Sequence, residues 1–286
     1  MTSAAWVWLS QHLMPKNLSS TVVYHATRSR RRWLKRPLIR WFARAYRVDL
    51  RDAADPDLDS YATFNEFFTR ALRPGSRPIE SGPETLVAAA DGVLTEHGAI
   101  DGDRLLQAKG RDYSLAELLG ETGAAVDALH GGSYLTIYLA PHNYHRVHAP
   151  LAGTLVRARY IPGDRFSVSR ATAAAISRLF CRNERVVCWF DTAHGPLVVV
   201  LVGALNVSSI STVAHGEIAS GAPREWRETR PRSFAQGDEI GRFNMGSTVI
   251  VLTGVRATWR TAITLGATVR VGEALADFGQ QRDEPR

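Results

Sequence analysis

The chain has 286 residues, of which 45% are hydrophobic and 22% are charged. This composition is sufficient for one large domain or two small ones with a real core, and it excludes a disordered chain. Two cysteines are too few for a disulfide framework, so we expect both to be reduced and at least half-buried. Reduced cysteines fit best with a protein that faces the cytosol. No apolar run approaches the roughly 18–20 residues of a spanning helix, and the N-terminus lacks a signal-peptide pattern.

The formal net charge of +7 is concentrated near the N-terminus, where residues 28–47 hold nine Arg or Lys and no acid. We predict that residues 1–48 form a basic, amphipathic helical arm. A first helix has one apolar face, formed by Trp6, Leu9 and Leu13. A second helix is expected to start at Pro37, with Leu38, Trp41, Phe42 and Ala45 on its apolar side and Arg40, Arg44 and Arg47 opposite.

An apolar face, tryptophan at its edge and basic residues opposite are typical of a helix in a membrane interface. Each Lys or Arg near an anionic leaflet contributes about 1 kcal/mol to such binding. Docking of the apolar face on the rest of the chain is an alternative that is compatible with membrane binding. Nucleic acid is the third candidate, and we expect no nucleic-acid partner.

Residues 49–286 are predicted to be the catalytic body. Ser60–Leu72 is expected to be one helix with Phe64, Phe67, Phe68 and Leu72 on one face, and short helices are expected at Ser114–Leu119 and Ala171–Leu179. From Val87 onward, short β-rich runs are separated by Gly, Pro, Asn and Asp. The predicted fold class is therefore α+β, with a mostly-β body and a helical N-terminal arm.

The densest polar cluster, residues 140–150, follows the apolar strand predicted at 133–139. It contains His142, His145 and His148, and strand ends often carry functional sites. A separation of three positions between successive histidines is not a usual metal-ligand spacing, and the cluster lacks a carboxylate. Surface or structural histidines remain an alternative. A general-base function is favoured, and we expect no metal.

Two further positions could support chemistry. Asp91, in the run Ala-Ala-Ala-Asp-Gly, is typical of a turn, but it could also orient a histidine. The tripeptide Gly246-Ser247-Thr248 precedes a β-branched apolar run and could be a simple strand-entry turn. Glycine before serine also permits a strained backbone, from which the Ser247 hydroxyl could attack the Gly246 carbonyl.

Taken in order, these segments resemble the phosphatidylserine decarboxylase proenzyme family, in its longer bacterial and mitochondrial-type subclass. The matching runs are YATFNEFFTRALRPGSRPI, AADGV, LQAKGRDYSL, YLAPHNYHRVHAP, YIPGDRFSV, LFCRNERVV, FDTAHGPLVVVLVGA and EIGRFNMGSTVIVL. The resemblance implies a self-cleavage triad of Asp91, His148 and Ser247. It implies a function for His145 in decarboxylation and none for His142. Met245 stands where the family usually has Leu, and Asn244 where a basic residue is common.

The resemblance further implies cleavage between Gly246 and Ser247 into residues 1–246 and 247–286, with a covalent pyruvoyl cofactor made from Ser247. The enzyme would be a carboxy-lyase that forms a Schiff base with phosphatidylserine and releases CO2 and phosphatidylethanolamine. It would lie peripherally on the cytoplasmic face of an anionic membrane, and a homodimer is left open.

The segments HAPLAGTLVRARYIPGD and GDEIGRFNMGSTVIVL look like the hammerhead sandwich of biotinyl and lipoyl carriers, which is an analogy of fold only. Two other functions are consistent with the residues alone. One is a metal-dependent phospholipid hydrolase that uses the three histidines, and the other is a non-enzymatic membrane or nucleic-acid adaptor that uses the arm.

Overall fold

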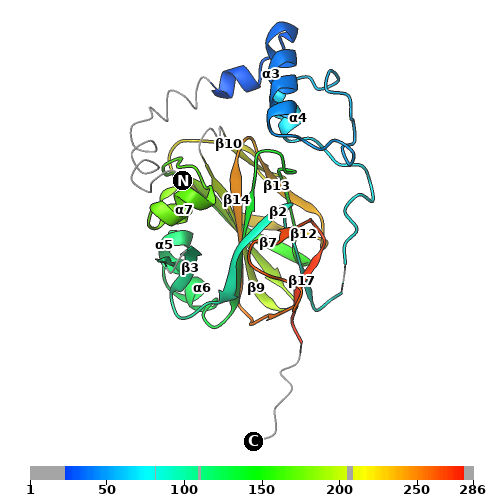
Figure 1. Cartoon of the computed structure of the whole chain (residues 1–286). Coiled ribbons are helices and arrows are strands. Elements are labelled where there is room, and N and C mark those ends of the chain that lie inside the picture. Colours follow the sequence, from blue (N-terminus) through cyan, green and yellow to red (C-terminus); the bar gives the residue numbers. More distant parts are fainter. Residues whose placement is uncertain (1–22, 81, 109–110, 205–208, 280–286) are drawn as a thin grey trace, which may run out of the picture.

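The computed structural model describes residues 23–80, 82–108, 111–204 and 209–279, so the helix predicted around Trp6, Leu9 and Leu13 lies outside the described residues. A mostly-β body carries a helical arm above one end (Figure 1). Its largest sheet has eight strands, all antiparallel to their neighbours. In spatial order they are β12 (Arg224–Phe234), β7 (Gly153–Ile161), β8 (Arg185–Thr192), β9 (Gly195–Gly203), β14 (Ser247–Thr253), β5 (Ser133–Leu139), β2 (Gly92–Ala99) and β16 (Thr268–Val269).

Smaller sheets complete the body, and the mostly-β, α+β prediction is confirmed. One contains β11 (Gly216–Ala219), β10 (Ser209–Thr212), β13 (Glu239–Phe243) and β6 (Arg146–His148). Another contains β1 (Thr85–Val87), β17 (Ala274–Asp277) and β15 (Thr258–Trp259). A hairpin joins β3 (Arg104–Ala108) to β4 (Arg111–Ser114).

Strand β14 lies inside the large sheet and is buried throughout. Its residues pair with β5 on one side and β9 on the other, so that Ser247 is opposite Leu139 and Gly203. The run Val249–Leu252 is at most 1% exposed, as expected for a strand covered on both faces. Because Ser247 is its first residue, the candidate serine is fixed at the edge of the core.

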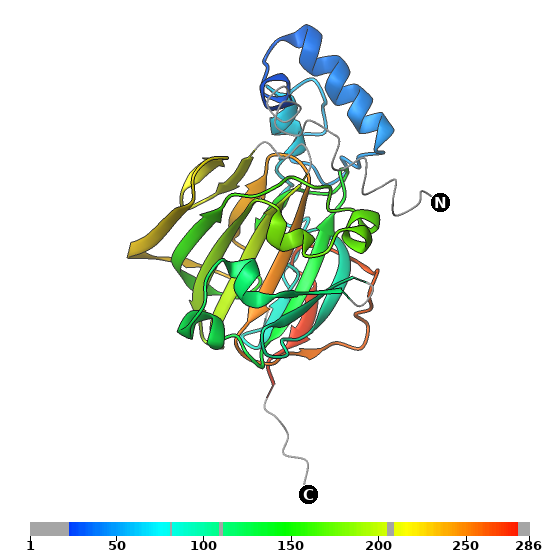
Figure 2. The same cartoon turned by 90° about the vertical axis from the view of Figure 1, so that its left-hand side faces the viewer.

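Short helices lie across one face of this sheet, as Figure 2 shows. The predicted helix at 114–119 is confirmed as α5 (Leu115–Leu119), capped by the Ser114 hydroxyl, and α6 (Ala124–Asp127) follows it. The single helix predicted at 171–179 is wrong. It is divided into α7 (Arg170–Ala175) and α8 (Leu179–Arg182), because Arg178 has a left-handed backbone with φ 53°.

The arm helix α3 (Arg32–Ala45) begins five residues before the predicted start at Pro37. Pro37 lies inside the helix, where it lacks the N–H that would bond to an earlier carbonyl. The predicted apolar face is also wrong in part. Ile39 and Phe42 are buried, whereas Trp41 is 57% exposed.

The buried face of α3 packs on α4 (Phe64–Phe68), which is much shorter than the helix predicted over Ser60–Leu72. Thr63 caps its first turn by accepting from the Glu66 N–H, and Glu66 reaches back to the Ala62 N–H, so the chain cannot be helical before this point. The predicted phenylalanine face is confirmed: Phe64, Phe67 and Phe68 are at most 2% exposed. Phe42 meets them with ring centroids 5.1–6.3 Å away.

Both cysteines are free thiols, Cys188 buried and Cys181 half-buried, as predicted. Within residues 23–279, the described part of the chain, no helix is both long and apolar enough to cross a membrane.

Candidate active site

The segment before Ser247 is anchored at both ends. On one side, the Asn244 amide donates to the hydroxyls of Ser209 (2.8 Å) and Ser211 (2.9 Å), and its backbone N–H donates to the Ser209 carbonyl. The side-chain oxygen Oδ1 of Asn244 also accepts from the side-chain amide of Asn65, which lies in α4. On the other side, β14 starts at Ser247 and is held by two neighbouring strands.

Between these anchors the backbone is strained. Met245 has φ 130°, a value that residues with a side chain rarely adopt, and Gly246 follows with φ 49°. Such conformations cost of order 1–3 kcal/mol and persist only where the surrounding structure enforces them. The strain is therefore placed directly before the Gly246–Ser247 peptide bond.

Ser247 contacts His145. Its hydroxyl oxygen lies 3.4 Å from the Nδ1 atom of His145, and both residues are 0% exposed. The His145 ring stacks on Phe68 with centroids 4.0 Å apart. Burial, reinforced by the positive charge of Arg70, lowers the pKa of His145 to about 3. His145 is therefore neutral at physiological pH and can accept a proton.

His148 is held by other groups. Its Nδ1 lies 2.7 Å from the Gly237 carbonyl, which only accepts, so Nδ1 carries the proton. The bare Nε2 then accepts from the Tyr144 hydroxyl at 3.0 Å. Burial lowers the pKa of His148. The ring is thus a neutral imidazole in the tautomer that a base needs, with its lone pair occupied by Tyr144.

Asp91 is buried against Arg77. The guanidinium donates to both carboxylate oxygens at 2.6–3.1 Å, and the Val271 N–H donates to one of them at 2.9 Å. No hydrogen bond joins Asp91 to His148. The structure therefore brings Ser247 together with His145, and does not connect Asp91, His148 and Ser247 by hydrogen bonds.

The three histidines of the polar cluster have separate surroundings. His142 is exposed and lines a cleft, His145 faces Ser247, and His148 faces Tyr144. Among the described residues, no group of three or more His, Cys, Asp or Glu is arranged to hold a metal ion.

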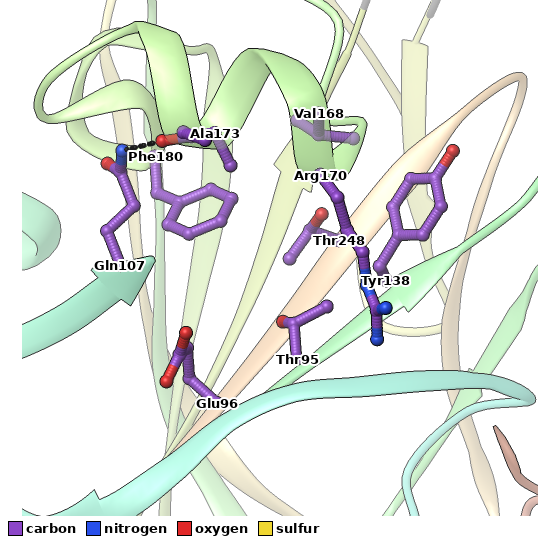
Figure 3. Close-up of a pocket in the computed structure, with 10 residues that line it drawn as sticks. Thr95, Glu96, Gln107, Tyr138, Val168, Arg170, Ala173, Phe180 and Thr248 are labelled. Atoms are coloured by element: carbon purple, nitrogen blue, oxygen red, sulfur yellow. Dashed lines mark hydrogen bonds between the residues drawn. The ribbon is translucent and has the colours of Figure 1, made fainter. Parts of the chain in front are cut away.

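A pocket of about 180 Å³ lies beside the start of β14 and is lined by Thr248, the residue after the candidate serine. Figure 3 shows Thr248 and Tyr138 near Arg170, with Glu96 and Gln107 on the opposite side. Val168, Ala173, Ala174 and Phe180 make part of the lining apolar. Gln107 is fixed by donating to the Ala173 carbonyl at 2.7 Å. The pocket combines an apolar wall with a cation.

Sequence reasoning missed four residues that shape this region: Arg70, Arg77, Tyr144 and Asn244. Tyr144 and Asn244 lie inside the motifs that were singled out, so their positions were visible but their contacts were not. Arg70 and Arg77 follow the phenylalanine helix in an arginine-rich stretch. Nothing in the spacing shows that Arg77 would pair with a carboxylate 14 residues away.

A buried serine beside a neutral histidine, next to a pocket, is the constellation of an enzyme rather than of an adaptor. The family model described as phosphatidylserine decarboxylase matches residues 64–277, and a second model described as PSD matches residues 7–47. The chain is 49% identical over 270 residues to the phosphatidylserine decarboxylase proenzyme of Methylococcus capsulatus, covering 93% of this chain and 94% of that protein. It is 46% identical over 277 residues to the proenzyme of the same name from Ectopseudomonas mendocina, covering 94% and 96%.

The proenzyme of that name from Pseudomonas aeruginosa is 46% identical over 275 residues, with 93% and 95% covered. Matches of this extent run through the arm, the histidine cluster and the junction at Ser247. The chain belongs to the phosphatidylserine decarboxylase family.

Proposed function

We propose that this protein is a self-processing, pyruvoyl-dependent decarboxylase that converts phosphatidylserine to phosphatidylethanolamine and CO2. The observation that supports the proposal most strongly is the strained junction at Met245–Gly246, directly before a buried serine that starts the central strand. Each of the relatives above is named a proenzyme, a term that refers to a precursor that is processed.

Self-cleavage requires only this chain and water. A base removes the Ser247 hydroxyl proton, and the oxygen attacks the Gly246 carbonyl carbon. Breakage of the peptide C–N bond gives an ester, and β-elimination then releases the Gly246 carboxylate and leaves dehydroalanine at 247. This enamine tautomerises to an imine, which adds water and loses ammonia, and the pyruvoyl group remains. Release of the backbone strain at Met245 favours the first step.

We assign the base function to His148 and its orientation to Asp91. The tautomer of His148 supports this assignment, because the Gly237 carbonyl fixes the proton on Nδ1 and leaves Nε2 unprotonated, as a base requires. Tyr144 occupies Nε2 in the precursor, so the triad assembles only when this hydrogen bond opens. Asp91 would act from its ion pair with Arg77.

The surroundings of Ser247 fit a pyruvoyl group. His145 Nε2 is buried without a hydrogen-bond partner among the described residues, so a polar atom is available beside position 247. A pyruvoyl group held there would supply an electrophilic ketone for the substrate amine and a sink for the electron pair left by CO2. His145 then donates a proton to the substrate α-carbon, a transfer that typically contributes about 10²–10⁴-fold.

The arm supports action at a membrane surface. With Ile39 and Phe42 docked on the body, α3 leaves Trp33 69% and Trp41 57% exposed. Trp41 lies in a groove whose other lining residues are Arg36, Pro37, Arg40, Arg44 and Ala45. Exposed tryptophan among arginines suits the headgroup region of an anionic leaflet. We therefore propose peripheral binding at the cytoplasmic face of the membrane.

Two finer predictions belong with this proposal. The predicted hammerhead sandwich stays a prediction: the first segment that suggested it forms β7, which pairs with β8 and β12, whereas the second forms β13 and β14, which pair with other strands. A homodimer stays a prediction, as does the division of the chain at residue 48.

Intact-protein mass spectrometry tests the function most directly. The purified protein should contain fragments 1–246 and 247–286, the second carrying a ketone that a hydrazine reagent labels, and it should release CO2 from phosphatidylserine. Ser247→Ala should remain whole and inactive. Ser133→Ala is the matched control, because Ser133 is also a buried serine that starts a strand of the same sheet, and this variant should be cleaved. Active protein that consists only of the intact chain would disprove the proposal.

A further inference from the structure

Arg70 is a buried cation with no carboxylate of the described residues in direct contact. Its side chain is 5% exposed, and no carboxylate of the described residues lies within 4.0 Å of its guanidinium. Nη2 donates to the carbonyls of His142 (3.0 Å) and Asn143 (3.5 Å), while Nε is buried with no partner. Burial lowers the pKa of Arg70, but a guanidinium remains protonated. Burying such a charge is costly unless an anion or several acceptors compensate it.

Arg185 shows what a purely structural buried arginine looks like in the same protein. It is 3% exposed and also has no carboxylate partner. However, its three nitrogens donate to four backbone carbonyls, those of Glu117, Leu118, Cys181 and Asn183, at 2.6–3.0 Å. Arg70 has only the two carbonyls at Nη2. The Nε–H group of Arg70 therefore lacks an acceptor, and an incoming anion would supply one.

Arg70 lines a cleft of about 150 Å³, which makes such an anion possible sterically. The three aspartates of this cleft are already paired: Asp49 with Arg51, Asp52 with Arg77, and Asp91 with Arg77. Arg47, also in the lining, is exposed and has no carboxylate within 4.0 Å among the described residues. Two arginines thus face this space without a carboxylate in direct contact.

The cleft lies between the arm and the candidate catalytic residues. Arg47 follows the end of α3, and Arg70 follows the end of α4, and these helices lie together above one end of the sheet (Figure 1). Phe68, two residues before Arg70, stacks on His145, which contacts Ser247. Arg70 is thus connected to Ser247 through two intervening side chains, and its cleft also adjoins Arg47 at the end of the arm helix.

We propose that Arg70, assisted by Arg47, binds the phosphodiester of the lipid headgroup and so places the serine moiety at position 247. This inference rests on the proposed function. A guanidinium matches the geometry of phosphate oxygens and forms charge-assisted hydrogen bonds with them. The serine headgroup has one methylene and one ester oxygen between its α-carbon and phosphorus, so the phosphate must be bound close to the reacting carbon.

The carboxylate of the substrate is the wrong anion for this site. It loses its charge as CO2 departs, so a cation that held it would stabilise the ground state more than the transition state. The phosphodiester keeps its charge throughout the reaction. Binding it also offsets the positive field that Arg70 exerts on His145, which favours protonation of the proposed proton donor.

The test measures binding separately from catalysis. Full-length Ser247→Ala protein, which cannot form the cofactor, is titrated by calorimetry with three soluble probes: glycerophosphoethanolamine, L-serine and inorganic phosphate. The first has the phosphodiester without a carboxylate, the second the reverse, and the third represents a free-phosphate site. We expect glycerophosphoethanolamine to bind most tightly and Arg70→Gln to weaken it about 10- to 100-fold, the value of hydrogen bonds to a charged group. Arg70→Lys should restore part of the affinity.

Two matched variants separate this function from a structural one. Arg185→Gln should lower the melting temperature and leave probe binding unchanged in the folded protein. Arg170→Gln removes the cation of the pocket in Figure 3.

Loss of probe binding in Arg170→Gln but not in Arg70→Gln would overturn the assignment. It would also be overturned if only L-serine binding depended on Arg70, or if inorganic phosphate bound as tightly as glycerophosphoethanolamine. If Arg70→Gln fails to fold, titrations of Arg47→Gln and Arg70→Lys with the same probes test the assignment instead. Probe binding without decarboxylation by the wild type would refute the proposed function alone.

Discussion

The buried, neutral His145 predicts how the stability of the precursor depends on pH. The pKa of His145 is about 3 in the folded chain, and 6.5 is the ordinary value that applies in the unfolded chain. Between pH 3 and pH 6.5 the unfolded chain therefore binds one proton more than the folded chain. Stability is fully present above pH 6.5 and is lost as the pH falls. One such proton changes the unfolding free energy by about 1.4 kcal/mol per pH unit.

From pH 6.5 to 4.5, His145 alone should therefore remove about 2–3 kcal/mol. The assay is urea unfolding of the uncleaved Ser247→Ala protein at a series of pH values, compared with the same protein carrying His145→Phe or His145→Asn. The phenylalanine variant keeps an aromatic ring against Phe68, and the asparagine variant keeps a polar group. His148 and the carboxylates titrate in all three proteins, so their contributions cancel in the difference. Parallel pH profiles would show that His145 is not buried as a neutral imidazole.

Three further predictions concern the site and the arm. His148→Ala and Asp91→Asn should each block chain cleavage on a denaturing gel, whereas His145→Ala should be cleaved and labelled by hydrazine but nearly inactive. If His145→Ala remained uncleaved, the base function would have to be assigned to His145, the histidine that contacts Ser247. Phe42→Ala should destabilise the arm–body contact by about 3–5 kcal/mol, which limited proteolysis after the arm would reveal. An unchanged digestion pattern would mean that Phe42 does not hold the arm. Trp41→Ala should weaken co-sedimentation with anionic vesicles, and salt should weaken it further. If the wild type and Trp41→Ala bound the vesicles equally, the face of α3 that carries Trp41 would be excluded as the membrane-binding surface.

Much of the body could be predicted because its central strands are continuous apolar runs. Strands β9 and β14 contain the continuous apolar runs LVVVLV and VIVL, which are buried on both faces. Strand β12 was missed for the opposite reason. Its sequence, REWRETRPRSF, alternates charges and contains Pro231, and it is extended only because the edge of β7 is available for pairing.

The site was predictable as a set of positions and not as a set of contacts. The order of motifs identified Asp91, His148 and Ser247, but the partners of each depend on side-chain packing between distant segments. Arg77 reaches Asp91 from the preceding motif, and the Gly237 carbonyl reaches His148 from a segment 89 residues further along the chain. His145 precedes β6, so the spacing of three residues from His148 could not tell which histidine would contact Ser247.

The position of Ser247 also predicts that cleavage leaves the fold intact. After cleavage, β14 would still be paired along its length with β5 and β9, and fragment 247–286 would still contribute β16 to the large sheet and both β15 and β17 to the smaller one. The bond that is broken lies before the first paired residue, and the nitrogen of Ser247 leaves as ammonia. Processing therefore removes at most the N–H of this one residue from the ladder of β14, and residues 248–253 stay paired. We expect the two fragments to co-elute in size-exclusion chromatography under native conditions and to separate only in denaturant. Spontaneous loss of the 247–286 fragment from processed protein would mean that the strained junction itself holds β14 in the sheet.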